Sequence, residues 1–213
     1  MAGFLKKWSA RETPRFGKRV KEAVRPSGPL RPRIELASRY IQMQISKLDS
    51  MAIRLKERDS TLFNKVVSNI QKHDMQHASI YANELAEVRK MYKMVNQAKV
   101  ALEQIVLRLN TATELGDIVV TLAPAMTVIR TVKAGLVQVM PEAEREISEI
   151  SSLLSSILVD AGQLGGLTLN FEAANEDAER ILMEASAIAE QKMKDKFPEL
   201  PGLTEGMGSG QTQ

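Results

Sequence analysis

Cysteine is absent from this chain of 213 residues, which excludes disulfides, thiolate nucleophiles and cysteine-ligated metals. Aromatic residues make up only 4% of the sequence, with a single tryptophan, whereas hydrophobic residues make up 44%. A core of Leu, Ile, Val, Met and Ala with few aromatic side chains suits helices that pack along their lengths. Strand-type alternation is nowhere sustained, and there is no internal repeat. The sequence therefore predicts an all-α protein.

A hydrophobic run long enough to span a bilayer is also missing. The longest uncharged apolar stretch, 118–129, includes Pro124 and is followed by Arg130 and Lys133. It holds about a dozen residues, whereas a spanning helix needs about 20. The start of the chain interleaves lysines with apolar residues, and no apolar h-region follows, unlike a secretory signal. We therefore expect a soluble chain that does not cross a membrane.

Acidic residues are scarce at the start of the chain, and basic residues are scarce towards its end. Residues 1–33 hold ten Lys or Arg and two acidic residues, whereas residues 141–199 hold thirteen acidic residues and five basic ones. The formal net charge of +3 hides this gradient. A basic segment with apolar anchors favours an anionic surface, and an acidic segment of the same chain can compete for it. The gradient predicts reversible attachment to a charged surface.

The basic segment is predicted to bind lipid. A short helix over 2–12 ends at Pro14, and a linker rich in Pro, Ser and Gly follows at 26–32. Each base near an anionic leaflet contributes about 1 kcal/mol, and apolar anchors add burial at the interface. A disordered basic tail and a nucleic-acid-binding segment are the alternatives, but the order Phe-Leu-x-x-Trp favours lipid. The predicted membrane-binding residues are Phe4, Leu5, Lys6, Lys7, Trp8, Arg11, Arg15, Lys18, Arg19 and Lys21.

Two long apolar stripes predict a helical hairpin after the linker. The first helix opens near Pro32, and we expect the chain to reverse at Asp59 and Ser60, which offer a break and an N-cap. Residues 60–110 contain neither Pro nor Gly. A helix over that range would be about 75 Å long, so the molecule is elongated or the helix bends when packed. The first stripe alternates steps of four and three, as in a two-helix seam, over Ile41, Ile45, Leu48, Ala52 and Leu55.

Three shorter helices are predicted after the hairpin. The third helix is capped by Gly116 and Asp117, contains Pro124 and ends near Gly135. The fourth begins at Pro141, and the fifth runs from about 171 to 194, after a glycine hinge. The predicted apolar sides are Ile147, Ile150, Leu154, Ile157 and Leu158 in the fourth, and Ala178, Ile181, Leu182, Ala185 and Ile188 in the fifth.

Candidate chemistry is sparse. His73 and His77 share a helix face, as in His-Glu-x-x-His zinc enzymes, but Asp74 replaces the glutamate and no other His or Cys exists. We interpret them as ordinary residues in the middle of a helix. The glycines of 162–167 lack a following Lys-Ser/Thr and a preceding strand, so they predict a hinge rather than a phosphate loop. We expect no enzymatic activity, metal site or cofactor.

The segment Phe-Pro-Glu-Leu-Pro-Gly-Leu, 197–203, is the second functional signal. Its prolines favour an extended backbone that presents Phe197, Leu200 and Leu203 at a spacing of three to a groove. A helix stop followed by a frayed terminus is the alternative interpretation.

The order of these segments along the chain resembles that of the ESCRT-III family, most closely its archaeal cell-division members of the CdvB type. The resemblance covers almost the whole chain: a basic N-terminal helix, a helical hairpin, smaller helices of increasing acidity and a terminal Pro-Leu motif. It implies an all-α fold with a long helical hairpin and additional small helices packed on it, elongated when open. Only ten residues follow the motif, so the chain is similar to the shorter paralogues, which join a filament started by others.

The resemblance also implies a function. Subunits of that family polymerise on membranes into filaments that constrict necks, and an MIT-domain AAA ATPase (CdvC in archaea) extracts them. The family's Pro-rich docking motif resembles Leu/Phe-Pro-x-Leu-Pro, and a second, helical docking motif would lie within 178–194. The residues that match the Pro-rich motif are Phe197, Pro198, Leu200, Pro201 and Leu203.

We therefore expect a subunit that remodels membranes during cell division, on the inner face of the cell membrane at the division site. Its expected partners are itself, paralogues, an anionic membrane and the ATPase, with no nucleic acid. The expected parts are the membrane-binding segment and linker (1–33), hairpin and third helix (34–140), acidic regulatory helices (141–195) and docking motif with tail (196–213). The acidic helices would fold back on the hairpin in a closed state. The alternative is a static coiled-coil adaptor that does not polymerise.

Overall fold

The computed structural model describes residues 30–112, 115–137, 139–165 and 171–198, which form helices and no strand. The all-α prediction is confirmed. The predicted short helix at 2–12 lies outside the described residues. The helices are α2 (Leu30–Gln71), α3 (Met75–Thr111), α4 (Leu115–Leu136), α5 (Ala143–Gly165) and α6 (Phe171–Lys196).

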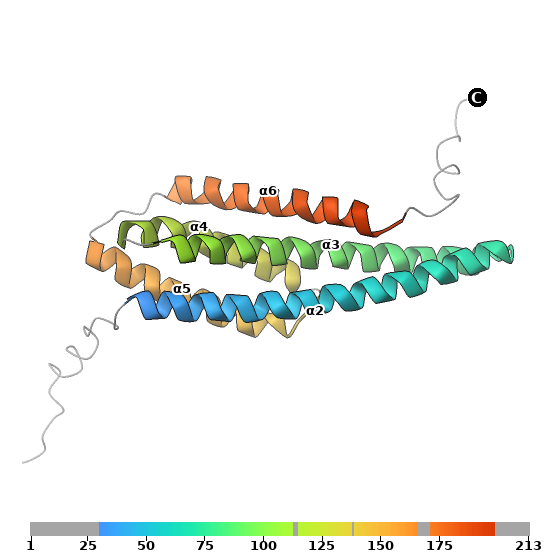
Figure 1. Ribbon diagram of the computed structural model, residues 1–213, viewed down its shortest axis with the longest axis horizontal. Coiled ribbons are helices and arrows are strands. Elements are labelled where there is room, and N and C mark those ends of the chain that lie inside the picture. The colour runs from blue at the N-terminus through green and yellow to red at the C-terminus, as the bar shows by residue number, and fades with distance from the viewer. Residues whose placement is uncertain (1–29, 113–114, 138, 166–170, 199–213) are drawn as a thin grey trace, which may run out of the picture.

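Helices α2 and α3 form an antiparallel hairpin along the long axis of the molecule (Figure 1). They hold 42 and 37 residues, which correspond to lengths of about 63 Å and about 55 Å. The predicted seam of α2 is confirmed, because all five of its stripe residues are buried. The opposing α3 side chains are buried too, and they include Val88, Val95, Leu102, Ile105 and Leu109.

The predicted reversal at Asp59 and Ser60 is wrong, because α2 continues to Gln71. Ser60 lies within the helix, where its hydroxyl donates a hydrogen bond to the carbonyl of Lys56 at 3.2 Å, a local bond that helices tolerate. Asp59 remains helical because Arg89 of α3 pairs with its carboxylate. The two arms of the hairpin are therefore similar in length.

The chain reverses at residues 72–74 without Gly or Pro. His73 adopts a left-handed backbone with φ of 58°. The amide of Asp74 donates to the carbonyl of Asn69 at 2.9 Å, and that of His73 donates to Ile70 at 2.9 Å, which is the hydrogen-bond pattern of a Schellman helix end. Asp74 then caps α3 by accepting from the His77 amide at 3.1 Å. His73 lies in the hairpin turn and His77 in the first turn of α3, so the interpretation of the two as a mid-helix pair is corrected.

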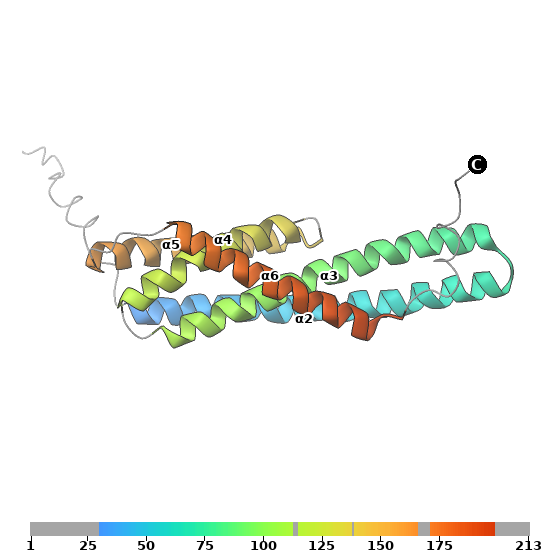
Figure 2. The ribbon, with the colours of Figure 1, turned by 90° about the horizontal axis from the view of Figure 1, so that it is seen from above.

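At the open end of the hairpin, α4 and α5 complete a four-helix arrangement. Helix α4 packs on α3 and α5, and α5 packs on α2. Helix α6 covers the seam between α3 and α4 and crosses the hairpin obliquely (Figure 2). In both views the closed end of the hairpin projects beyond α4, α5 and α6. Helix α2 begins at Leu30, before the expected boundary at residue 33, with Pro32 in its first turn, where a missing N–H has no cost.

Helix α4 contains Pro124, as predicted, and buries Leu122, Val128, Ile129 and Leu136. Its segment Asp117–Leu136 is long and apolar enough to cross a membrane by length and composition alone. Buried core helices meet the same criterion, and half of its most apolar window is buried among the other helices.

The turn geometry leads to a stability prediction. A non-glycine residue in the left-handed region costs about 1 kcal/mol, so we expect His73→Gly to raise the free energy of unfolding by up to that amount. His77→Gly, in the first turn of α3, should lower it by about 0.5 kcal/mol. Urea denaturation followed by circular dichroism compares the two variants. Equal effects of the two glycines would show that the turn is not strained.

Candidate regulatory interface

Helix α5 closes over the hairpin with a large apolar face. Ile147, Ile150, Leu154 and Ile157 are buried, as the sequence predicts, whereas Leu158 is half-buried at the edge. Branched side chains of this size contribute about 1.5–3 kcal/mol each when fully buried. The apolar face of α5 is therefore a large part of the attachment of this helix to α4 and α2.

Acidic residues of α5 pair with basic residues of α2. Arg33 forms an ion pair with Asp160, and its Nη2 donates a hydrogen bond to the Ser156 hydroxyl at 2.7 Å. Lys47 pairs with Glu146 at the other end of the same contact. The two ion pairs fix one register of α5 along α2, because each joins a particular residue of α2 to a particular residue of α5.

Helix α6 attaches through small side chains. Ala178, Ile181, Ala185 and Ala189 are buried in steps of three and four residues, which let the helix lie close to α3 and α4. The predicted side of α6 is confirmed for Ala178, Ile181 and Ala185, but Ile188 is 41% exposed and Ala189 takes the buried position. Because alanine removes little area from water, this helix is held less strongly than α5.

The polar contacts of α6 are long or exposed. The Gln104 side chain donates to Glu184 at 3.1 Å, and Lys93 lies 3.7 Å from Glu190, both ends being solvent-exposed. The last turn of α6 is basic and faces Asp49 of α2. The hydrogen bond and the charge of Lys99 lower the pKa of Asp49, and Lys196 and Lys192 lower it further, against an opposing effect of burial. At this end of α6 the charges are therefore reversed, with basic residues of α6 near an acidic residue of α2.

Phe197, directly after α6, is buried against the hairpin. Its ring meets the ring of Tyr92 edge to face, with centroids 4.7 Å apart, and the Arg89 guanidinium lies 5.4 Å from its centroid. Arg89 Nε donates to Asp59 Oδ1 at 2.6 Å, and Asp59 is 3% exposed. We call Tyr92, Arg89 and Asp59 the Phe197 pocket. Sequence reasoning missed Tyr92 and Arg89 and interpreted Asp59 as a helix break, although Asp59 continues the apolar spacing of Leu55 and Leu62, which signals a buried charge with a partner.

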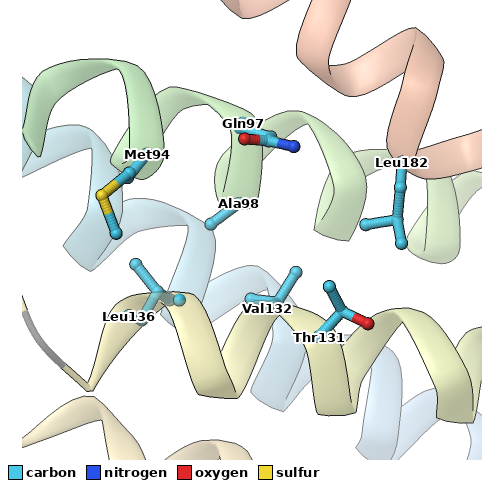
Figure 3. Close-up of a pocket in the computed structure, with 8 residues that line it drawn as sticks. Met94, Gln97, Ala98, Thr131, Val132, Leu136 and Leu182 are labelled. Atoms are coloured by element: carbon cyan, nitrogen blue, oxygen red, sulfur yellow. The ribbon is translucent and has the colours of Figure 1, made fainter. Parts of the chain in front are cut away.

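A small cavity of about 170 Å³ lies where α3, α4 and α6 meet. Met94, Ala98, Val132 and Leu136 supply apolar walls, and Leu182 of α6 supplies another (Figure 3). The polar groups at its edge are the side chains of Gln97 and Thr131. Without a charged side chain to orient a ligand, this cavity is a packing gap under α6.

The remaining predicted residues are placed only in part. The ten membrane-binding residues, and Leu200, Pro201 and Leu203 of the docking motif, lie outside the described residues, whereas Pro198 is exposed. His77 Nδ1 lies 2.8 Å from Asp74 Oδ2 in the hairpin turn. Among the described residues, no group of three or more His, Asp or Glu could hold a metal ion.

The geometry defines a class of protein: a long helical hairpin whose open end is covered by shorter charged helices, α5 and α6, that fold back on it. Comparison with known proteins identifies the family. The chain is 43% identical to cell division protein B1 of Sulfolobus acidocaldarius over 179 residues, 83% of this chain and 84% of that protein. It is 35% identical to cell division protein B of the same organism over 161 residues, 76% of this chain and 62% of that longer protein. This chain belongs to the cell division protein B family, the CdvB type. No family model and no solved structure matches it.

The register pairs allow a charge-exchange prediction. Arg33 and Asp160 are partly buried, with side chains 19% and 23% exposed, so we expect Arg33→Glu to weaken the attachment of α5 by about 1 kcal/mol. The double variant Arg33→Glu with Asp160→Arg should recover most of the loss, since the pair is restored with opposite polarity. Hydrogen exchange of α5 amides measures the effect. Equal exchange in the single and double variants would show that this pair does not hold α5.

Proposed function

We propose that the chain is a membrane-remodelling, filament-forming subunit of the ESCRT-III type that acts in archaeal cell division. Two relatives that cover most of this chain are named as cell division proteins. The fold supports the proposal because α2 and α3 present long surfaces suited to side-by-side packing. A subunit with this role needs no catalytic group of its own.

The observation that carries the proposal is the closed arrangement of α5 and α6 on the hairpin. Helix α5 covers apolar surface of α2, and α6 covers apolar surface of α3 and α4. Surface that is covered in one copy cannot bind another copy. Removing α5 and α6 would uncover this surface along the open end of the hairpin and create the apolar patches that drive association.

Opening is inexpensive for α6 and costly for α5. The small buried side chains and exposed ion pairs of α6 favour closure by only a modest free energy. The closed state needs to be favoured by only a few kcal/mol to respond to a ligand that prefers the open state. We propose that membrane binding or the ATPase supplies that preference, with α6 leaving before α5.

The basic N-terminal segment would bring the chain to the inner face of the cell membrane at the division site. It lies outside the described residues, so its charge and its apolar residues Phe4, Leu5 and Trp8 are the support for this step. The residues from Phe197 onward would bind the MIT domain of a CdvC-type ATPase, which would remove subunits from the filament.

Truncation tests the closed state. We expect a chain that lacks residues 141–213 to form sedimentable filaments at concentrations where the full chain stays in the supernatant, because the hairpin surfaces are then uncovered. A chain that lacks only 204–213 keeps all described helices and should behave as the full chain does. Negative-stain microscopy separates filaments from amorphous aggregate. A truncated chain that stays monomeric would contradict autoinhibition, and a fixed, concentration-independent oligomer would indicate the static adaptor.

Vesicle floatation tests membrane binding. We expect the full chain to float with anionic vesicles at low salt and to lose binding at high salt. The triple variant Lys6→Gln, Lys7→Gln, Arg11→Gln should bind at least about 10-fold more weakly, given the contribution of each base near the leaflet. The matched control Lys56→Gln, Lys65→Gln, Lys72→Gln removes three charges from the hairpin and should bind normally. Equal loss in the two variants, or a salt-dependent gel shift with RNA but no floatation, would refute lipid binding by this segment.

A further inference from the structure

One side of α2 presents apolar residues that no described helix covers. Leu36, Tyr40 and Met43 are 40%, 40% and 54% exposed, and they follow one another at steps of four and three residues. Residues at these steps share one face of a helix. Helix α5 packs on α2 but leaves these three side chains accessible. The first part of the hairpin therefore keeps an apolar stripe at its surface.

Two residues of the stripe also line a groove between α2 and α5. The groove has a volume of about 170 Å³, and Tyr40, Met43 and Ile150 give it apolar walls. Gln44 lines it as well and is only 2% exposed. Its Nε2 is buried and has no hydrogen-bond partner within the described part of the chain. A buried donor without a partner is costly, so an occupant with an apolar group and a hydrogen-bond acceptor would complete the site. We call Leu36, Tyr40, Met43, Gln44 and Ile150 the Tyr40 groove.

The charge beside the Tyr40 groove is negative. Residues 142–149, which include the first turns of α5, hold four glutamates and one arginine. Glu146 and Glu149 line the groove, and their ion pairs with Lys47 and Arg145 are solvent-exposed. Exposed ion pairs contribute little free energy, so these glutamates can exchange their partners for other basic residues. The rim of the groove therefore favours a basic occupant.

Residues 1–29 have the chemistry that this groove requires. They hold eight basic and two acidic residues, and they carry the apolar side chains of Phe4, Leu5 and Trp8. The sequence predicts a helix over 2–12 that ends before Pro14. The last four carbonyls of a helix have no partner within it, so the end of this helix offers acceptors for Gln44.

The segment is also tethered within reach of the groove. Helix α2 begins at Leu30, and Met43 lies about 20 Å further along the helix axis. Residues 13–29 span up to about 56 Å when extended, which is enough for the predicted helix to lie back along α2. A tethered segment binds at a high effective concentration, so even a small groove can hold it.

We propose that residues 2–12 dock in the Tyr40 groove when the chain is off the membrane, and that lipid competes with the groove for the same apolar side chains. This inference rests on the proposed membrane binding of residues 4–21. The groove has walls from both α2 and α5, so it exists only while α5 lies on α2. A docked segment favours the closed chain, and lipid that takes up the segment removes this contact. Membrane binding and opening are thereby coupled.

The fluorescence of Trp8 tests docking directly, because it is the only tryptophan of the chain. Without lipid, we expect acrylamide to quench Trp8 more strongly in the variant Tyr40→Ser with Met43→Ser than in the unchanged chain. The matched control is Met75→Ser with Ile80→Ser, at positions that are 57% and 56% exposed near the closed end of the hairpin. The control should quench as the unchanged chain does. Equal quenching in the two variants would overturn docking.

Vesicle floatation measures the competition. With vesicles of phosphatidylglycerol and phosphatidylcholine in equal parts, we expect the Tyr40→Ser, Met43→Ser variant to bind about 10-fold more tightly than the unchanged chain, because the segment is no longer held in the groove. The direction is diagnostic, since a loss of apolar surface by itself would weaken lipid binding. The Met75→Ser, Ile80→Ser control should bind as the unchanged chain does. Equal or weaker binding of the groove variant would overturn the competition.

The two measurements separate this inference from the proposed membrane function. If no form of the chain floats, membrane binding is refuted, and the quenching of Trp8 without lipid decides docking by itself. If all forms float equally and quench equally, membrane binding stands and docking is overturned. Protection of Trp8 that increases with protein concentration would assign the groove to the segment of a second copy and overturn docking within one chain.

Discussion

The apolar seam between α2 and α3 is the interaction on which the other contacts of this molecule depend. It runs the length of the hairpin, from Ala37 and Ile41 near the open end to Val66 near the turn. Each of the three later helices packs directly on one arm of the hairpin. Helix α5 packs on α2, whereas α4 and α6 pack on α3. The hairpin supplies both the surface that is covered in the closed chain and the pocket that receives Phe197. Because the α2–α3 seam is more extensive than the contact of any other helix with the hairpin, those helices can detach while the hairpin stays folded.

The buried side chains are larger in α5 than in α6. Helix α5 buries large branched side chains and adds the Arg33–Asp160 pair. Helix α6 relies on alanines, Ile181 and exposed polar contacts, with the Phe197 ring at its end. Local opening draws on the least stable elements first. By this reasoning α6 is the helix that opens most easily, because its buried side chains are mostly small.

Much of the fold could be predicted from the sequence because apolar spacing decides it. The stripe through Ile41, Leu48 and Leu55 fixes a helix whatever lies opposite, and the apolar face of α5 does the same. The hairpin turn could not be predicted in this way. Asp59 and Ser60 look like a helix start, but a partner 30 residues away in α3 satisfies the Asp59 carboxylate. The true turn uses His73 where glycine would be expected, because backbone hydrogen bonds at the end of α2 stabilise a conformation that local propensity disfavours.

The sequence by itself determined the helical class, the seam, the gradient of charge along the chain and the presence of an aromatic–proline motif after the last helix. Each of these depends on residues close together along the chain, where spacing and composition suffice. Only the tertiary structure decided the length of each arm, the use of Ala189 rather than Ile188 on α6 and the burial of Phe197 against Tyr92 and Arg89. Those outcomes depend on contacts between residues distant in sequence, which become defined when the return helices pack on the hairpin.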